Sequence, residues 1–282
     1  MNIIIPTLGR IKTQITFNNL PARWKEKVQF IVQEHEYEDF CDAHGSRHVH
    51  KLPNTIDNIA ATREWIYNNF KHDRYFVFDD DLEFTVKEPN KEGSPKWKSR
   101  VFNHKDFDDM FNTVNSWMDN KITHGGLGTT WVIPSIDLWP HADNTKIMTN
   151  VFYDGPNMPN NIEWQRVQYA EDFDVNLQLL TQGYANRVST KYMVSPSDTN
   201  SEGGCSINRT LDAHNKSQKK LKELWPEYVR LKEKVTKTGP WKGKVKLGTV
   251  IQHKKAFKNG EYIKKYHEFK KEWEVKLPHL IQ

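Results

Sequence analysis

The feature that most constrains the fold is a short apolar run that ends abruptly in three carboxylates. Residues 75–78 read Tyr-Phe-Val-Phe, and Asp79, Asp80 and Asp81 follow without a break. A continuous apolar run of this length predicts a buried strand. Asp79 and Asp81, two apart in an extended segment, point the same way and could share a hard divalent ion with a ligand's phosphates. A solvated acidic turn is the alternative, and this stretch alone does not decide between them.

Short β-type runs and helical patterns alternate before these aspartates. An apolar, β-branched run occupies residues 2–5, residues 28–32 predict a second strand, and residues 47–52 are a candidate third strand. Residues 55–70 predict a helix with Thr55 as its N-cap. Such alternation predicts an α/β fold with a mostly parallel central sheet flanked by helices, whose ligands bind at the carboxyl edge of the strands. Gly9, Arg10 and the aspartates all fall on that edge, which favours a binding role for them.

The middle of the chain continues the pattern. Residues 107–118 form an apolar helical stripe that we interpret as core packing, residues 146–153 predict a strand, and residues 88–100 predict a polar loop. The Gly-rich stretch 124–130 lacks the Gly-Lys-Ser/Thr ending of a P-loop. It either brings backbone close to a ligand or turns the chain.

A second acidic feature opens a predicted helix near residue 170. Glu171 and Asp172 precede apolar residues at helical spacing, and Gly183 suits the position just after the helix end. The helix dipole alone favours acidic residues in a first turn. The functional alternative is that Asp172 faces a cleft and acts as a general base. Residues 184–190 predict a final strand.

The net charge of +5 hides a strong asymmetry. Residues 1–200 carry a balance of −6, whereas residues 201–282 carry +11. We therefore predict two units: a catalytic domain over 1–200 and a basic, mainly helical extension over 201–282, with a helical stretch at 214–237 that Pro226 kinks or breaks. Lysines interleaved with aromatics suit a nucleic-acid surface. The alternatives are solvated lysine faces and aromatics that anchor terminal helices onto the body.

Several features bear on compartment and assembly. The sequence contains no run of eighteen apolar residues and no charged-then-apolar leader, so neither a membrane span nor a signal peptide is expected. Cys41 and Cys205 lie far apart and lack metal-ligand spacing, which indicates reduced thiols. We expect a cytoplasmic monomer with no membrane partner.

Four motifs in this order resemble those of GT-A fold glycosyltransferases. Residues 3–10 resemble the opening strand and nucleotide-contacting turn, and residues 58–63 resemble the helix start beside the donor base, although Glu64 stands where that superfamily usually has Asn. The three aspartates resemble its DxD motif, and residues 171–172 resemble its later acidic pair.

The resemblance implies specific roles for these residues. Mn²⁺ or Mg²⁺ would be held by Asp79 and Asp81. The nucleotide-sugar donor, such as a UDP-sugar, would be bound by Thr7, Arg10, Arg63, Asp79 and Asp80. Asp172, with Glu171 beside it, would be the base of an inverting transfer to an acceptor hydroxyl.

More narrowly, the chain resembles phage-encoded DNA-base glycosyltransferases, including the TET-associated group. The similarity rests on the segment 203–210, Gly-Gly-Cys-Ser-Ile-Asn-Arg-Thr, and on the basic end of the chain. It implies that the acceptor is a 5-hydroxymethylated base in double-stranded phage DNA and that the protein acts in the host cytoplasm. His214 resembles the histidine that completes the metal shell in several GT-A enzymes.

Two other functional classes fit part of the pattern. A metal-dependent nuclease or phosphotransferase acting on DNA could use clustered aspartates and a basic tail without any nucleotide-sugar. A non-catalytic DNA-binding protein would need only the tail. Stabilisation by UDP that depends on a divalent metal favours the transferase over both.

Overall fold

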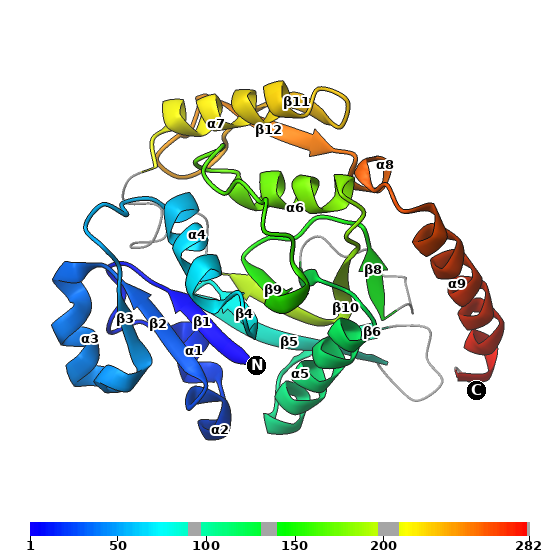
Figure 1. Cartoon of the computed structure of the whole chain (residues 1–282), viewed down its shortest axis with the longest axis horizontal. Coiled ribbons are helices and arrows are strands. Elements are labelled where there is room, and N and C mark those ends of the chain that lie inside the picture. The colour runs from blue at the N-terminus through cyan, green and yellow to red at the C-terminus, as the bar shows by residue number, and fades with distance from the viewer. Residues whose placement is uncertain (90–96, 131–139, 197–208, 281–282) are drawn as a thin grey trace.

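The computed structural model describes residues 1–89, 97–130, 140–196 and 209–280. Figure 1 shows a central sheet with helices packed around it, and the C-terminal elements gathered at the top and right of that view. No helix in the described part of the chain combines the length and apolarity that a membrane span requires.

The body consists of strands and helices that alternate over its first 80 residues. The strands are β1 (Asn2–Pro6), β2 (Val28–Val32), β3 (Val49–Lys51), β4 (Arg74–Phe78), β5 (Leu82–Pro89), β6 (Trp97–Val101), β7 (His124–Thr129), β8 (His141–Asp143), β9 (Asn150–Asp154) and β10 (Asn186–Pro196). The helices are α1 (Ile15–Asn19), α2 (Ala22–Lys25), α3 (Tyr37–His44), α4 (Ile59–Phe70), α5 (His104–Asp119) and α6 (Glu171–Thr181).

Within the described residues these strands form one ten-stranded sheet in the order β3-β2-β1-β4-β9-β7-β10-β5-β6, with β8 paired to β10. The pairings set β5, β8 and β9 antiparallel to the other strands. The pairs β1–β2, β1–β4, β2–β3 and β7–β10 are parallel. The prediction of an α/β fold with a mostly parallel central sheet and flanking helices is therefore confirmed.

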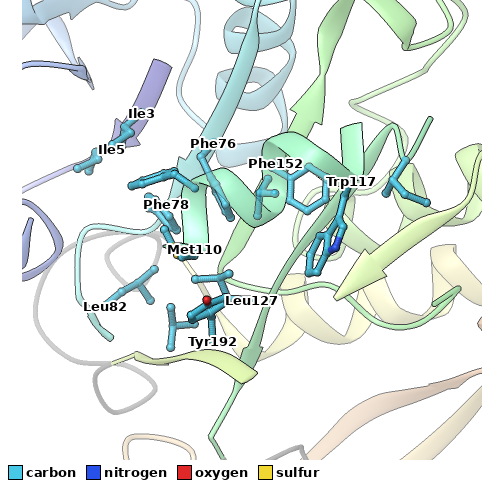
Figure 2. Close-up of a cluster of buried hydrophobic side chains, with 14 of the residues drawn as sticks. Ile3, Ile5, Phe76, Phe78, Leu82, Met110, Trp117, Leu127, Phe152 and Tyr192 are labelled. Carbon is cyan, nitrogen blue, oxygen red and sulfur yellow. The ribbon is translucent and has the colours of Figure 1, made fainter. Parts of the chain in front are cut away.

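Alternation of apolar side chains along the strands builds a core on each face of the sheet. Ile3, Ile5, Phe76 and Phe78 belong to one buried cluster, which includes the apolar stripe of α5. Figure 2 shows several of these side chains packed together with Met110, Trp117 and Phe152. The intervening residues of β1 and β4 belong to a second cluster with α4. Because successive strand residues point to opposite faces, such continuously apolar strands require cover on both sides.

Three predictions about local structure were wrong. α4 begins at Asn58, whose side chain accepts the N–H of Ala61 at 3.0 Å, and not at Thr55. Part of the predicted polar loop 88–100 lies in β5 and β6, although residues 90–96 are outside the described part. The Gly-rich stretch is neither a turn nor a ligand loop, because it forms the fully buried strand β7. A Cβ at Gly125 or Gly126 would collide with neighbouring backbone or side-chain atoms.

The C-terminal extension contains a β-hairpin as well as helices. It comprises α7 (Leu211–Leu224), β11 (Val229–Val235), β12 (Val245–Ile251), α8 (His253–Ala256) and α9 (Gly260–Leu280). The predicted helical stretch 214–237 is thus corrected, since α7 ends before Pro226 and an antiparallel pair follows it. Proline cannot donate the helical hydrogen bond, and the valines beyond it favour a strand.

Some aromatics of the extension anchor it to the body. Phe257 is buried in the same cluster as Ile3 and Phe76. Tyr262 of α9 donates a hydrogen bond to the buried Asp143, which also pairs with Arg187. These side chains therefore anchor the extension onto the body, which is the alternative to a role in a nucleic-acid surface.

Candidate active site

The first part of the site joins the loop after β1 to the end of β4. Asp80 is buried, and its two carboxylate oxygens accept hydrogen bonds of 2.5 Å from the Thr7 hydroxyl and from the Arg10 guanidinium. Gln14 donates to the Thr7 hydroxyl at 2.8 Å. Burial raises the pKa of Asp80, and the contacts with Thr7 and Arg10 partly offset that rise. Thr7, Arg10 and Asp80 are thus brought together, with their polar groups turned toward one another.

The aspartates on either side of Asp80 have different surroundings. Asp81 pairs with Arg10 at 3.0 Å, and its side chain is mostly buried. Asp79 is 36% exposed, and its N–H donates to the Thr149 carbonyl at 2.9 Å. Loss of solvation raises the pKa of Asp79 to about 7. The negative charges of Asp81 and Asp80 raise this pKa further, and the positive charge of Arg63 lowers it. Asp79 therefore holds a proton more readily than an ordinary aspartate, because its protein neighbours compensate its negative charge incompletely.

Arg63 lies between the two acidic groups that the sequence analysis identified. It extends from the second turn of α4, where its guanidinium lies 4.0 Å from Asp79 Oδ1 and 3.3 Å from Glu171 Oε1. Its Nε is buried and makes no hydrogen bond within the described residues. Burial alone would lower the pKa of Arg63, but Glu171, Asp172 and Asp79 outweigh it and raise the pKa. One guanidinium thus faces carboxylates from β4 and from α6.

Glu171 and Asp172 form the first turn of α6. Asp172 Oδ1 accepts the N–H of Phe173 at 2.8 Å, which ties the side chain to the helix end. Burial raises the pKa of Glu171 to about 7 and also raises that of Asp172, while Arg63 opposes both shifts. A carboxylate with a raised pKa is a stronger base than an ordinary aspartate, which suits proton abstraction near neutral pH.

A small cavity lies beside Arg63 and Asp172. Its walls include Arg63, Tyr153, Asp172 and the segment 147–150. Thr149 in that segment has φ +61°, a left-handed conformation that is costly for a β-branched residue. The same residue receives the Asp79 N–H, so the strained backbone helps to position Asp79. Backbone conformation of this kind leaves no pattern in the sequence, and residues 146–149 were predicted as strand.

Lys146 is a second residue that the sequence analysis did not identify. Its ammonium group lies 5.0 Å from the centre of the Phe173 ring. Burial lowers the pKa of Lys146, the charge of Lys234 lowers it further, and the charge of Asp172 raises it. Lys146 therefore supplies a cation beside Asp172, on a side chain that looks in the sequence like any surface lysine.

Glu36, near the carboxyl edge of the sheet, is a third residue that the sequence analysis did not identify. It follows β2, and its Oε1 accepts the N–H of Gly9 at 2.7 Å. Its other oxygen is buried without a hydrogen-bond partner among the described residues. Gly9, in the turn Pro-Thr-Leu-Gly-Arg, has φ +72°, a left-handed conformation that glycine adopts without a steric cost. One glutamate among several acidic residues in a polar stretch gives no sign of this position in the sequence.

His214 is not brought to the aspartates. Its Nε2 bonds to the Leu247 carbonyl at 2.8 Å, and its Nδ1 lies 3.1 Å from Arg209. Both ring nitrogens are therefore engaged within the extension, and the role of His214 as a metal ligand stays a prediction. No group of three or more His, Cys, Asp or Glu side chains in the described part of the chain has the arrangement of a metal site.

The segment that carried the narrower resemblance is described only in part. Residues 203–208 lie outside the described residues. Arg209 follows them with its guanidinium 5.6 Å from the centre of the Tyr169 ring. Its charge also lowers the pKa of Glu171 and of Asp172, which places a cation near the acidic pair.

Carboxylates from a strand end and a helix start, gathered at one edge of a mostly parallel α/β sheet, are typical of glycosyltransferases. The chain belongs to the TET-associated glycosyltransferase family, whose model matches residues 1–204. This membership confirms the predicted resemblance and the prediction that the protein is a glycosyltransferase.

The chain is also similar to individual phage proteins and to one solved structure. The beta-glucosyl-HMC-alpha-glucosyl-transferases of Enterobacteria phages T6 and T2 are each 25% identical over 236 residues, covering 82% of this chain and 84% of the relative. Among solved structures, S. aureus TarS 1–349 is similar with a TM-score of 0.42 and 12% identity, over 79% of this chain and 66% of that one.

Proposed function

We propose that the protein transfers a sugar from a UDP-sugar to a hydroxyl carried by a hydroxymethylated base in double-stranded phage DNA. The observation that carries this proposal is the convergence of Asp79, Glu171 and Asp172 on Arg63 at the carboxyl edge of the sheet, in a member of this family. The names of the phage relatives, which describe action on glucosylated HMC, support the choice of acceptor.

The donor would lie along the carboxyl edge, where Thr7, Arg10 and Arg63 lie. Arg63 is suited to a phosphate, because a guanidinium presents several donors and the ion pair of its Nε with Glu171 leaves its terminal nitrogens with only the 4.0 Å contact to Asp79 among the described acidic side chains. The carboxylates of Asp79 and Asp81 fit Mn²⁺ or Mg²⁺ in charge and in donor type, and the incompletely compensated charge of Asp79 supports this fit. A bound ion would neutralise diphosphate charge. Asp80 would act through Thr7 and Arg10, since both of its oxygens are occupied.

Asp172 would accept the proton of the acceptor hydroxyl. Burial raises its pKa, whereas the nearby Lys146 and Arg209 favour its ionised form. The balance keeps a basic carboxylate ready at neutral pH. A base inside a duplex is out of reach of such a cavity, so the acceptor base must rotate out of the stack.

The stereochemistry of transfer distinguishes two versions of this mechanism. A base at Asp172 with direct attack predicts inversion. The relatives' names describe an α-glucosyl product, and an α-linked donor would give that product by retention. The anomeric configuration of the product, read from its proton coupling, decides between them: a configuration opposite to that of the donor supports Asp172 as the base.

A panel experiment tests the function as a whole. The protein is incubated with several nucleotide-sugars, Mn²⁺ and DNA that contains hydroxymethylcytosine, with unmodified DNA as the control. Mass analysis of the nucleosides should show a sugar on hydroxymethylcytosine and none on cytosine. Cleaved or phosphorylated DNA in place of a glycosylated nucleoside would contradict the proposal.

Asp81→Ala tests the metal site within the same assay. We expect it to abolish transfer while the melting temperature stays close to that of the wild type, because Arg10 keeps its stronger contact with Asp80. Normal turnover in this variant would exclude Asp81 as a metal ligand.

A further inference from the structure

The hairpin β11–β12 carries a row of positive charge on one of its faces. The cross-strand pairs Arg230↔Val250, Lys232↔Gly248 and Lys234↔Lys246 alternate with pairs such as Glu233↔Leu247. Because alternate residues of a strand share a face, Arg230, Lys232, Lys234 and Lys246 lie on the same side, which we call the basic ribbon face. Alternate residues along a strand are about 6.6 Å apart, so the row spans more than a single ligand phosphate.

The charges of this face lack acidic partners, unlike some of those on the neighbouring helices. None of its four cations makes an ion pair with the acidic side chains that the structure describes, and the three on β11 are exposed. By contrast, Lys216 of α7 pairs with Asp212 at 2.9 Å, and Lys265 of α9 pairs with Glu261 at 2.7 Å. The strand β11 thus presents three exposed cations in a row, without acidic partners among the described residues.

The basic ribbon face reaches the acidic end of α6. The charge of Lys234 lowers the pKa of Lys146, and the charge of Lys146 lowers the pKa of Asp172. On the other strand, the charge of Arg209 lowers the pKa of Lys246. The same charge lowers the pKa of Glu171 and of Asp172. The hairpin also lies close to α6 in the fold, because Trp225, just before β11, donates a hydrogen bond to Asp174 of α6. In Figure 1 the hairpin lies on the same side of the sheet as α6.

The attachment of the hairpin is rigid enough to hold a macromolecule in register. Just before it, Trp225 donates to the buried Asp174 of α6 at 2.6 Å. Just after it, the Lys258 N–H donates to the Leu180 carbonyl at 3.2 Å. On its outer edge, Asn215 of α7 accepts the Leu247 N–H at 2.8 Å. These bonds attach the hairpin to α6, whose first turn carries Asp172.

We propose that the basic ribbon face binds the phosphate backbone of the acceptor duplex and sets the position from which the target base enters the site at Asp172. This inference rests on the proposed function. A polyanion with regularly repeated charge matches an extended row of unpaired cations, and a two-stranded β-ribbon is narrow enough to follow a groove of DNA. The nucleotide-sugar does not account for the row, because its proposed site is at Arg10 and Arg63.

A pair of charge-matched variants tests the proposal. The ribbon variant is Arg230→Gln, Lys232→Gln and Lys234→Gln. The control is Lys216→Gln, Lys219→Gln and Lys220→Gln, which removes three exposed cations from α7 of the same extension. Binding to a hydroxymethylcytosine duplex is measured by fluorescence anisotropy at several salt concentrations, and thermal melting checks that both variants fold.

The two variants should differ in the salt dependence of binding. Each lost phosphate contact lowers the slope of log affinity against log salt by about 0.9, so the ribbon variant should lose roughly 2 to 3. The control should keep the slope of the wild type. The single variants Arg230→Gln, Lys232→Gln and Lys234→Gln should each lose about 0.9, which keeps the test valid if the triple variant is unstable.

Two contrary results have different meanings. Equal slopes for the ribbon variant and the wild type, with DNA still glycosylated by the wild type, would overturn the ribbon inference and leave the proposed function standing. A larger loss in the α7 control than in the ribbon variant would have the same consequence. Failure of the wild type to bind or modify any DNA would overturn both.

Discussion

Asp79, Asp80 and Asp81 are neighbours in the chain, but their surroundings differ. Asp80 is held by Thr7 and Arg10, Asp81 shares Arg10, and Asp79 faces Arg63. The sequence predicts that three carboxylates end a strand, and the resemblance predicts their function. It does not separate their individual roles, because the partners that distinguish them come from the loop after β1, about 70 residues earlier, and from helix α4.

The raised pKa of Asp79 makes protein stability depend on pH. In the unfolded chain an aspartate titrates near ~4, whereas Asp79 in the folded protein titrates at about 7. Between these values the folded state binds more protons than the unfolded state, so the free energy of unfolding falls as the pH rises. Asp79→Asn removes this contribution and should raise the melting temperature at neutral pH. The pKa of Glu171 is also about 7, so the stability of the Asp79→Asn variant should still depend partly on pH.

Melting curves in metal-free buffer from acid to neutral pH provide the measurement. Added Mn²⁺ should raise the melting temperature of the wild type at neutral pH and leave that of Asp79→Asn unchanged, since the ion binds the native carboxylate. A variant less stable than the wild type at neutral pH without metal would contradict the assigned electrostatics.

Asp172→Asn tests the base. The amide keeps the size of the side chain and can still accept the N–H of Phe173, so the fold should persist. Loss of general-base catalysis typically costs about 10²- to 10⁴-fold in rate. We expect a loss of transfer in that range, measured by nucleoside mass analysis, with the affinity for UDP unchanged in calorimetry. A fall in UDP affinity would instead place Asp172 in the donor site.

At the scale of elements, the predictions from sequence succeeded where local composition and packing agree. β1, β2 and β4 are apolar runs that need cover on both faces, and all three were predicted. The strand β7 was not predicted, because glycine is depleted in strands. Its glycines are needed here because residues distant in the chain leave no room for a Cβ. β11 was taken for helix, because its alternating lysines resemble a solvated helical face and its pairing partner lies beyond a turn.

The glycines of β7 and β12 provide a test of packing. A Cβ at Gly126 would lie 2.7 Å from the Asn150 backbone oxygen, whereas the nearest atom to a Cβ at Gly248 is 3.8 Å away. Gly126→Ala should therefore lower the free energy of unfolding by about 1 to 3 kcal/mol, as is usual for overpacked positions. Gly248→Ala should change it little. Equal effects in urea unfolding would show that β7 can shift to accept the side chain.

At the scale of the molecule, the two predicted units share one hydrophobic core. Leu221, Tyr228 and Val229 of the extension belong to the same buried cluster as Ile3 and Phe76 of the sheet. The change of charge near residue 200 marks a change of surface, which composition reveals. Whether the segments on either side fold together depends on contacts between distant residues, which composition does not reveal.

Trp225→Phe tests this shared core. Asp174 has no exposed surface and accepts hydrogen bonds from Arg166, Gln178 and Trp225. Removing the indole N–H leaves part of a buried carboxylate without its donor, which should cost about 1 to 3 kcal/mol. Phenylalanine keeps an aromatic ring beside Arg166, so packing is largely retained. We expect one cooperative urea transition at a lower midpoint, seen alike by circular dichroism and by tryptophan fluorescence. If the body keeps the wild-type midpoint while the extension unfolds earlier, the two segments are separate folding units, and the position of the basic ribbon face relative to Asp172 is adjustable.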